Sequence, residues 1–125
     1  SVKAALDILC DIGSGKRKWA VLGDMLELGD WAIDAHKEIG RLVSAYGIEY
    51  LIGIGDLARW YIKWAEEDGG SRTVSILFEN SSDAKSYIQA LMQKGDILLF
   101  KGSRRMKLDV LVQELLEEGL KKPCD

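Results

Sequence analysis

Apolar residues along this chain follow two alternating patterns. Short, mainly apolar runs occupy residues 19–22, 50–54, 73–78 and 97–100, and the runs at 19–22 and 97–100 are continuous. Runs of this kind are typical of strands buried on both faces of a parallel sheet. Between them, apolar residues recur at the three- and four-residue spacing of amphipathic helices. The pattern therefore predicts strands that alternate with longer helices.

The helical spacing predicts one helix before the first strand, over residues 4–11, and a second over residues 31–46. Three more helices follow the later strands. Four polar residues stand where side chains that cap helix N-termini are expected: Asp30, Asp56, Ser82 and Ser103. Gly47 stands where the second helix should end.

Strands that alternate with helices form right-handed βαβ units and a parallel sheet with helices on both faces. We therefore expect a Rossmann-like three-layer α/β/α sandwich with a mainly parallel sheet. The length of 125 residues suits one domain, so residues 1–125 are predicted to form a single domain. Folds of this type usually open on a strand, and this chain opens on a helix, so we expect a strand upstream.

Composition and charge exclude several functional classes. The net charge of -3 and the scattered basic residues argue against a nucleic-acid partner. The apolar runs are too short for membrane insertion, and the first residues do not resemble a signal peptide. Cys10 and Cys124 form no Cys-x-x-Cys pair, and a single histidine, His36, offers no metal-ligand cluster. We expect no bound metal, a reduced cytoplasmic setting, and an exposed thiol at Cys124 in the polar tail.

Candidate chemistry lies where the strands end, because ligands bind beyond the carboxyl ends of parallel strands. The segment Lys101-Gly102-Ser103-Arg104 follows the last strand. Gly102 permits unusual backbone angles and close approach of a ligand. Ser103 is predicted to open a helix whose first amides attract anions, and Lys101 and Arg104 add two positive charges. The segment therefore predicts an anion site, although an ordinary helix start with solvated charges has the same pattern.

A second candidate is the loop of residues 23–29, which two glycines bracket after the first strand. Its carboxylates, Asp24 and Glu27, could hold an ammonium group or a phosphate-bound Mg²⁺. Equally, Leu26 and Leu28 could pin the loop to the core while the acids face water. The residue types alone do not decide between these two interpretations.

The segment Gly53-Ile54-Gly55-Asp56-Leu57-Ala58 matches the G-x-G-x-x-A form of the dinucleotide fingerprint, at a strand-to-helix turn. Glu79, after the next strand, stands near the place of a ribose-binding acid. However, Gly53 falls inside the predicted strand, and Asp56 would put a negative charge against a pyrophosphate. The match is a weak signal.

His36 borders the apolar face of the second helix, which favours a buried histidine whose hydrogen bonds are satisfied. The helix follows the loop of residues 23–29, so His36 could also hold that loop.

Two segments together resemble a known family. The run from Ala20 to Gly29, which reads AVLGDMLELG, and the run from Leu99 to Arg104, which reads LFKGSR, resemble the C-terminal domain of the Mur ligases, in the type that adds D-alanyl-D-alanine. The opening residues 1–6 are similar to the family segment that follows an Asn-Ala-Asn-Pro strand end. Arg105 departs from the pattern, since a small residue is expected there.

The resemblance implies a three-domain, ATP-dependent ligase in which this domain presents the incoming D-alanyl-D-alanine. The other two domains would bind the UDP-muramoyl tripeptide and, with Mg²⁺, ATP. Asp24, Glu27, Lys101, Ser103 and Arg104 would then bind substrate. Gly23, Met25, Gly29 and Gly102 would shape the loops, and His36 would support them.

The resemblance also implies that this domain binds no cofactor alone, and we expect it to be inactive without its partner domains. Two alternatives remain: a stand-alone dinucleotide-binding domain, supported by Gly53–Ala58, and a receiver-like signalling domain. The second is supported by Asp24 after the first strand and Lys101 after the last.

Overall fold

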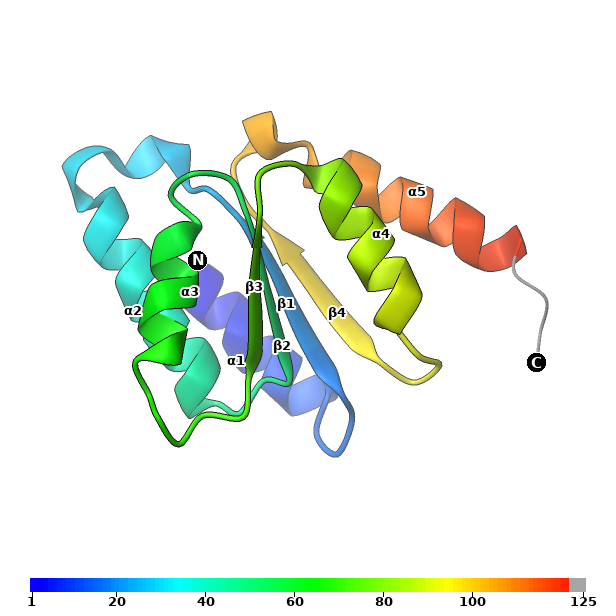
Figure 1. Cartoon of the computed structure of the whole chain (residues 1–125), viewed down its shortest axis with the longest axis horizontal. Helices are drawn as coiled ribbons and strands as arrows, with labels where there is room; N and C mark the ends of the chain where they lie inside the picture. Colours follow the sequence, from blue (N-terminus) through cyan, green and yellow to red (C-terminus); the bar gives the residue numbers. More distant parts are fainter. Residues whose placement is uncertain (122–125) are drawn as a thin grey trace.

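The structure, a computed structural model, describes residues 1–121 of the chain (Figure 1). Cys124 and the predicted end of the last helix, at residues 122–123, lie outside the described residues. The helices and strands follow one another as α1 (Val2–Ile12), β1 (Lys18–Gly23), η1 (Leu26–Trp31), α2 (Ala32–Ala45), β2 (Tyr50–Ile54), α3 (Arg59–Glu66), β3 (Val74–Phe78), α4 (Ser81–Leu91), β4 (Ile97–Lys101), η2 (Arg104–Met106) and α5 (Leu108–Lys121). Here η marks a 3₁₀ helix.

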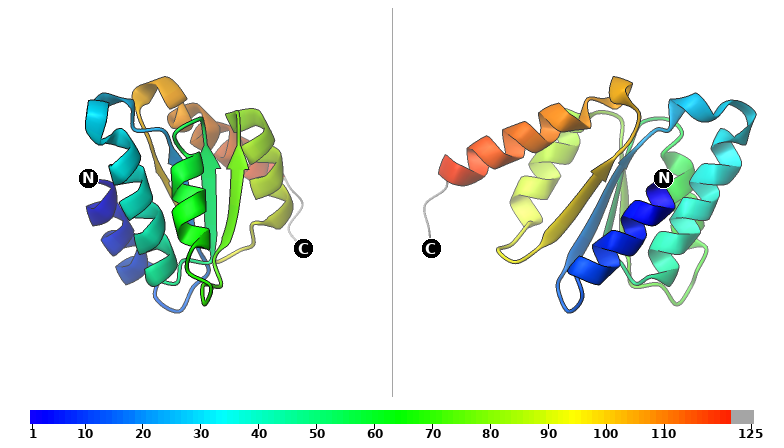
Figure 2. Two further views of the ribbon diagram at one scale, coloured as in Figure 1. Left: turned by 60° about the vertical axis from the view of Figure 1, so that its left-hand side comes forward. Right: turned by 180° about the vertical axis from the view of Figure 1, so that it is seen from behind.

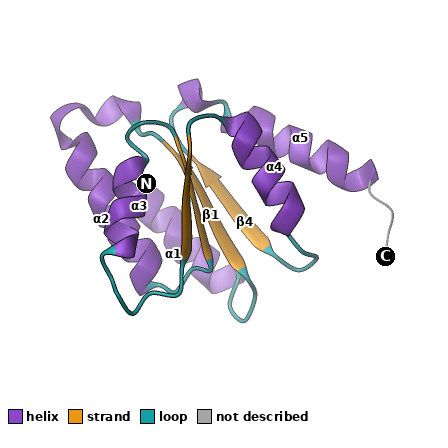
Figure 3. Cartoon of the chain, viewed as in Figure 1, coloured by secondary structure: helices purple, strands orange, loops and turns teal. Residues whose placement is uncertain are grey.

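The four strands, orange in Figure 3, form one parallel sheet in the order β3-β2-β1-β4, which the labels of Figure 1 identify. In the centre, Ala20 of β1 is paired with Leu51 of β2 on one side and Leu99 of β4 on the other. All carboxyl ends of the strands therefore meet at one edge of the sheet. The predicted Rossmann-like sandwich with a parallel sheet is confirmed.

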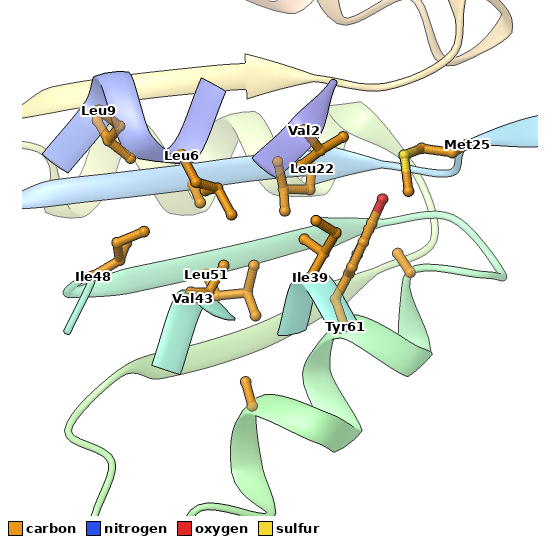
Figure 4. Close-up of a cluster of buried hydrophobic side chains, with 13 residues drawn as sticks. Val2, Leu6, Leu9, Leu22, Met25, Ile39, Val43, Ile48, Leu51 and Tyr61 are labelled. Carbon is orange, nitrogen blue, oxygen red and sulfur yellow. The ribbon is translucent and has the colours of Figure 1, made fainter. Parts of the chain in front are cut away.

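Helices cover both faces of the sheet, as the views in Figure 2 show. On β1, Ala20 and Leu22 point to the layer of α1, α2 and α3, whereas Trp19 and Val21 point to α4 and α5. Alternate residues of β1 thus belong to two separate cores, which is why this strand is apolar without interruption from Trp19 to Leu22. Figure 4 shows the first core, which contains Leu6, Leu22, Val43 and Tyr61.

Helices α2 and α3 pack closely against each other at a glycine. A Cβ atom added to Gly40 of α2 would lie 2.2 Å from the carbonyl oxygen of Tyr61 on α3. Only glycine allows this backbone contact, and it fixes where Tyr61 lies relative to α2.

The first three predicted helix caps are wrong, and the fourth, Ser103, is described with the site below. Helix α2 begins after Trp31 and not at Asp30, and α3 begins after Ala58, while the Asp56 side chain pairs with Arg59. Helix α4 is capped by Asn80, whose side chain accepts from the Asp83 N–H, and not by Ser82. In contrast, Gly47 follows the end of α2 with a φ of 68°, the left-handed conformation expected of a glycine there.

No helix within residues 1–121 combines the length and the apolar character that a membrane crossing requires.

The amino end of the sheet is held by a buried carboxylate, Asp96. It accepts hydrogen bonds from the Arg17 guanidinium, from Trp19 Nε1 at 3.0 Å and from the Gln93 N–H at 2.9 Å. Trp19 in turn stacks on Tyr50, with ring centroids 4.0 Å apart. Burial raises the pKa of Asp96, but the hydrogen bonds from Arg17, Gln93 and Trp19 outweigh it and leave the pKa below its ordinary value.

A lowered pKa makes Asp96 a source of acid sensitivity. Its contribution to the free energy of unfolding is present above the unfolded-state pKa of about 4 and is lost as the pH falls through the lower, folded-state value. We expect Asp96→Asn to reduce the free energy of unfolding at pH 7 by about 1–3 kcal/mol, because buried donors lose a charged acceptor. Urea unfolding of both proteins between pH 7 and pH 2 should show this difference shrinking in acid. The exposed Asp11→Asn is the control, and a constant difference across the pH range would contradict the assignment.

Candidate functional site

The carboxyl ends of β1 and β4 touch through two glycines. Leu22 is paired with Lys101, and directly beyond them a Cβ atom on Gly102 would lie 3.0 Å from the Cα of Gly23. The φ of Gly102 is not positive, so the unusual backbone angles that a glycine permits are not adopted there. Instead, Gly102 lacks a side chain because the backbone of Gly23 fills that space. This contact brings the two candidate segments together.

The loop after β1 forms the 3₁₀ helix η1 and bends at Gly29, which has a φ of 56°. The buried side chain that pins the loop is Met25, which lies in the first core (Figure 4). Leu28 packs against the same core, but Leu26 is 41% exposed. The predicted anchoring by Leu26 is therefore wrong, while the anchoring by Leu28 is confirmed.

Two buried aromatic side chains hold the loop by hydrogen bonds to its backbone. His36 is fully buried, and its Nε2 accepts from the Met25 N–H at 3.1 Å while its Nδ1 contacts the carbonyl of Ala32. The ring therefore carries its proton on Nδ1. The Tyr61 hydroxyl donates to the Gly23 carbonyl at 3.0 Å, and its ring packs on His36. Burial, with the charges of Asp24 and Glu27, raises the pKa of Tyr61, which keeps it a hydrogen-bond donor.

Asp24 points inward. It is 6% exposed, and its carboxylate accepts from the N–H groups of Asp56, at 3.1 Å, and Ala58, at 2.8 Å. Both donors belong to the turn between β2 and α3. The predicted contact of Asp24 with substrate stays a prediction.

Ser103 joins the two loops with three hydrogen bonds. Its N–H donates to the Asp24 carbonyl at 2.9 Å, its Oγ accepts from the Leu26 N–H at 2.7 Å, and its hydroxyl donates to the Glu27 carboxylate. The bond from Ser103, followed by backbone hydrogen bonds, holds the pKa of Glu27 below its ordinary value. Glu27 is exposed and ionised, and it lines the first of the two clefts described below.

The predicted capping of the last helix by Ser103 is wrong. Arg104 to Met106 form η2, Lys107 has a φ of 52°, and α5 begins only at Leu108. The extra turn brings Met106 over Gly23, where a Cβ atom would lie 3.0 Å from Met106 Cγ. The anion-attracting charge here therefore comes from the exposed side chains of Lys101 and Arg104, and not from the amides of a helix N-terminus.

Two clefts flank the Lys101-Gly102 segment. One, of about 490 Å³, lies between the start of α1 and the loop after β1, and its charged lining residues are Lys3, Glu27, Glu38 and Lys101. The other, of about 510 Å³, runs toward α5, and its polar lining includes Lys101, Ser103, Arg104 and Asp109. The clefts share Lys101 and Gly102, so a ligand that bridges them meets Glu27 and Glu38 in the first cleft and Arg104 in the second.

Within residues 1–121, no three His, Cys, Asp or Glu side chains gather closely enough to hold a metal ion.

Known proteins with the same sequence features identify the family. The family model described as "Mur ligase, glutamate ligase domain" matches residues 1–104. The chain belongs to the Mur ligase family.

Curated relatives agree. The UDP-N-acetylmuramoyl-tripeptide–D-alanyl-D-alanine ligase of Bacillus subtilis strain 168 is 36% identical over 123 residues, which are 96% of this Mur ligase chain and 26% of the relative. The enzyme of the same name from Synechocystis sp. is 36% identical over 122 residues, 95% of this chain and 25% of the relative. The chain thus spans about a quarter of the length of these ligases.

Solved structures show the same fold. A structure of MurF from Acinetobacter baumannii superposes with a TM-score of 0.78 at 27% identity, covering 94% of this chain and 25% of that one. The MurF ligase of Thermotoga maritima in complex with ADP gives a TM-score of 0.63 at 25% identity, covering 84% of this chain and 22% of that one.

The structure brings together most residues that the sequence singled out. Glu27, Lys101, Ser103 and Arg104 line one edge of the sheet, while Asp24 and His36 lie beneath it. Sequence reasoning missed the contribution of Tyr61, which carried only the signal of an inward-facing helix residue.

The link between Ser103 and Glu27 can be tested by titration. We expect Ser103→Ala to raise the pKa of Glu27 toward the ordinary value of about 4.3, because its main hydrogen-bond donor is lost. Carboxyl carbon chemical shifts followed by NMR against pH measure this directly. Ser86→Ala, an exposed serine on α4, is the control, and an unchanged Glu27 pKa in Ser103→Ala would show that the bond does not form in solution.

Proposed function

We propose that this chain is the C-terminal domain of an ATP-dependent ligase that joins D-alanyl-D-alanine to a UDP-N-acetylmuramoyl tripeptide in peptidoglycan synthesis. The observation that carries the proposal is the 36% identity with the Bacillus subtilis ligase over 96% of this chain. The proposal makes residues 1–125 one domain of a cytoplasmic enzyme whose N-terminal and central domains bind the other substrates.

In such a ligase, ATP phosphorylates the tripeptide carboxylate, and the amine of the dipeptide then displaces phosphate to form the amide. The task of this domain is to hold the dipeptide. Its ammonium group suits the exposed carboxylate of Glu27, and its carboxylate suits Lys101 or Arg104, since guanidinium and ammonium groups bind carboxylates through charge-assisted hydrogen bonds. Ser103 keeps Glu27 in place, and Gly23 and Gly102 keep the two loops in contact.

The nucleotide and its metal belong to another part of the proposed enzyme. The ADP complex of the Thermotoga maritima relative supports the use of ATP. Residues 1–121 gather no metal-ligand set, so we propose that Mg²⁺ is held with ATP by the central domain. The two exposed cations, Lys101 and Arg104, fit the negative charge of a phosphate as well as that of a dipeptide.

The anion role of Arg104 can be tested in the full-length ligase. We expect Arg104→Ala to raise the KM for D-alanyl-D-alanine about ten-fold or more, because a hydrogen bond to a charged group is lost. Arg105→Ala removes the same charge from the next exposed residue and serves as the control. A dipeptide KM that stays unchanged in Arg104→Ala would count against the role.

The proposed binding of ATP and the tripeptide by the other two domains leads to a second test. We expect the 125-residue chain alone to release no phosphate from ATP in the presence of both other substrates. A phosphate-release assay, with the full-length ligase as positive control, measures this. Turnover by the isolated chain at the rate of the full-length ligase would refute the domain assignment.

A further inference from the structure

The turn between β2 and α3 has the construction of an anion-binding turn. Gly55 adopts a φ of 120°, which favours glycine, and the N–H groups of Asp56 and Ala58 then point at one place. Helix α3 starts directly afterwards, with Ala58 at its N-cap, so the positive end of its dipole faces the same place. The residues Gly53, Gly55 and Ala58 are those that matched the dinucleotide fingerprint.

The place that a phosphate would take is already filled. The Asp24 carboxylate accepts from both amides, and a Cβ atom on Gly55 would lie 2.5 Å from Asp24 Oδ1. Gly55 therefore leaves room for a carboxylate of the same chain and not for an external ligand. No Lys or Arg among residues 1–118 forms an ion pair with Asp24, so the two amides and the helix end supply its stabilisation.

We propose that Asp24 is a built-in anion that occupies the Gly53–Ala58 turn, excludes phosphate groups from it and positions the loop that carries Glu27. The carbonyl of Asp24 accepts from the Ser103 N–H, and its neighbour Met25 is held by His36. The side chain of Asp24 thus ties the β2–α3 turn to the point where the loops after β1 and β4 meet. Asp24 is a positioning residue in this proposal, which rests on the geometry and not on the ligase assignment.

The proposal predicts that the turn regains an empty anion site when the carboxylate is removed. Asp24→Ala keeps Cβ and deletes one carboxylate, and formate has the shape and charge of the deleted group. In NMR titrations of the 125-residue chain, we expect formate to shift the Asp56 and Ala58 amides of Asp24→Ala in a saturable way. The Leu26 and Ser103 amide signals should return toward their wild-type positions, and the melting temperature should rise.

Three controls make the titration specific. Sodium chloride at equal ionic strength should give none of these effects. Asp56→Ala removes an exposed carboxylate from the same turn and should show no response to formate. In the wild-type chain, inorganic pyrophosphate should leave the Asp56 and Ala58 amides unshifted.

Two outcomes would overturn the proposal. One is pyrophosphate binding at the turn of the wild-type chain. The other is an Asp24→Ala chain that responds to formate no more than the wild type does. If Asp24→Ala does not fold, Asp24→Asn provides the test, because its amide group can accept from only one of the two N–H groups. The Asp56 or Ala58 amide should then exchange with solvent about ten-fold faster or more, and unchanged exchange of both would overturn the proposal.

Discussion

A carboxylate cannot remain buried unless hydrogen bonds replace the water it has lost, and this requirement organises one end of the molecule. Asp24 satisfies this requirement by accepting hydrogen bonds from two backbone N–H groups in the turn between β2 and α3. These two hydrogen bonds fix the course of the chain after β1. The loop then lies within hydrogen-bonding distance of His36, Tyr61 and Ser103. The exposed residues of the site are held in place by an acid that is itself almost hidden from solvent.

The two acids of this loop serve different ends. Asp24 is buried, and each of its carboxylate oxygens accepts from a backbone N–H, whereas Glu27, three residues later, is exposed and accepts from Ser103 and from backbone N–H groups. One fixes the backbone, and the other remains available to a ligand. The sequence alone left two interpretations of the loop even: that its acids bind a ligand, or that its leucines pin it while the acids face water. The second is wrong for Asp24, which is buried, and ligand binding by Glu27 stays a prediction.

The elements of the fold could be predicted from local patterns. Strand β2 has the predicted bounds, and β1 and β4 differ from prediction by one residue at their ends, because a strand buried on both faces is apolar throughout. Helix starts were predicted less well. A serine or aspartate is a cap only if its side chain is free to fold back, and the side chains of Ser103 and Asp56 are engaged elsewhere.

The internal contacts of the site could not be read from the sequence for a different reason. The donors to Asp24 are backbone N–H groups, and every residue except proline carries one, so no residue type marks them. The contact of Gly102 with Gly23 is likewise invisible until the sheet places the two strand ends side by side. Lys101 and Arg104 were recognisable because charge at a strand end is a property of the side chain itself.

The glycine contact between α2 and α3 has a mechanical consequence. His36 stands on α2 and Tyr61 on α3, and Gly40 lets the backbones of these helices meet without intervening side chains. At this contact no side chain separates the two backbones, so a shift of α2 there would displace α3 as well. A displacement of the loop from the cleft side would therefore move α2 and α3 together, and not one side chain alone.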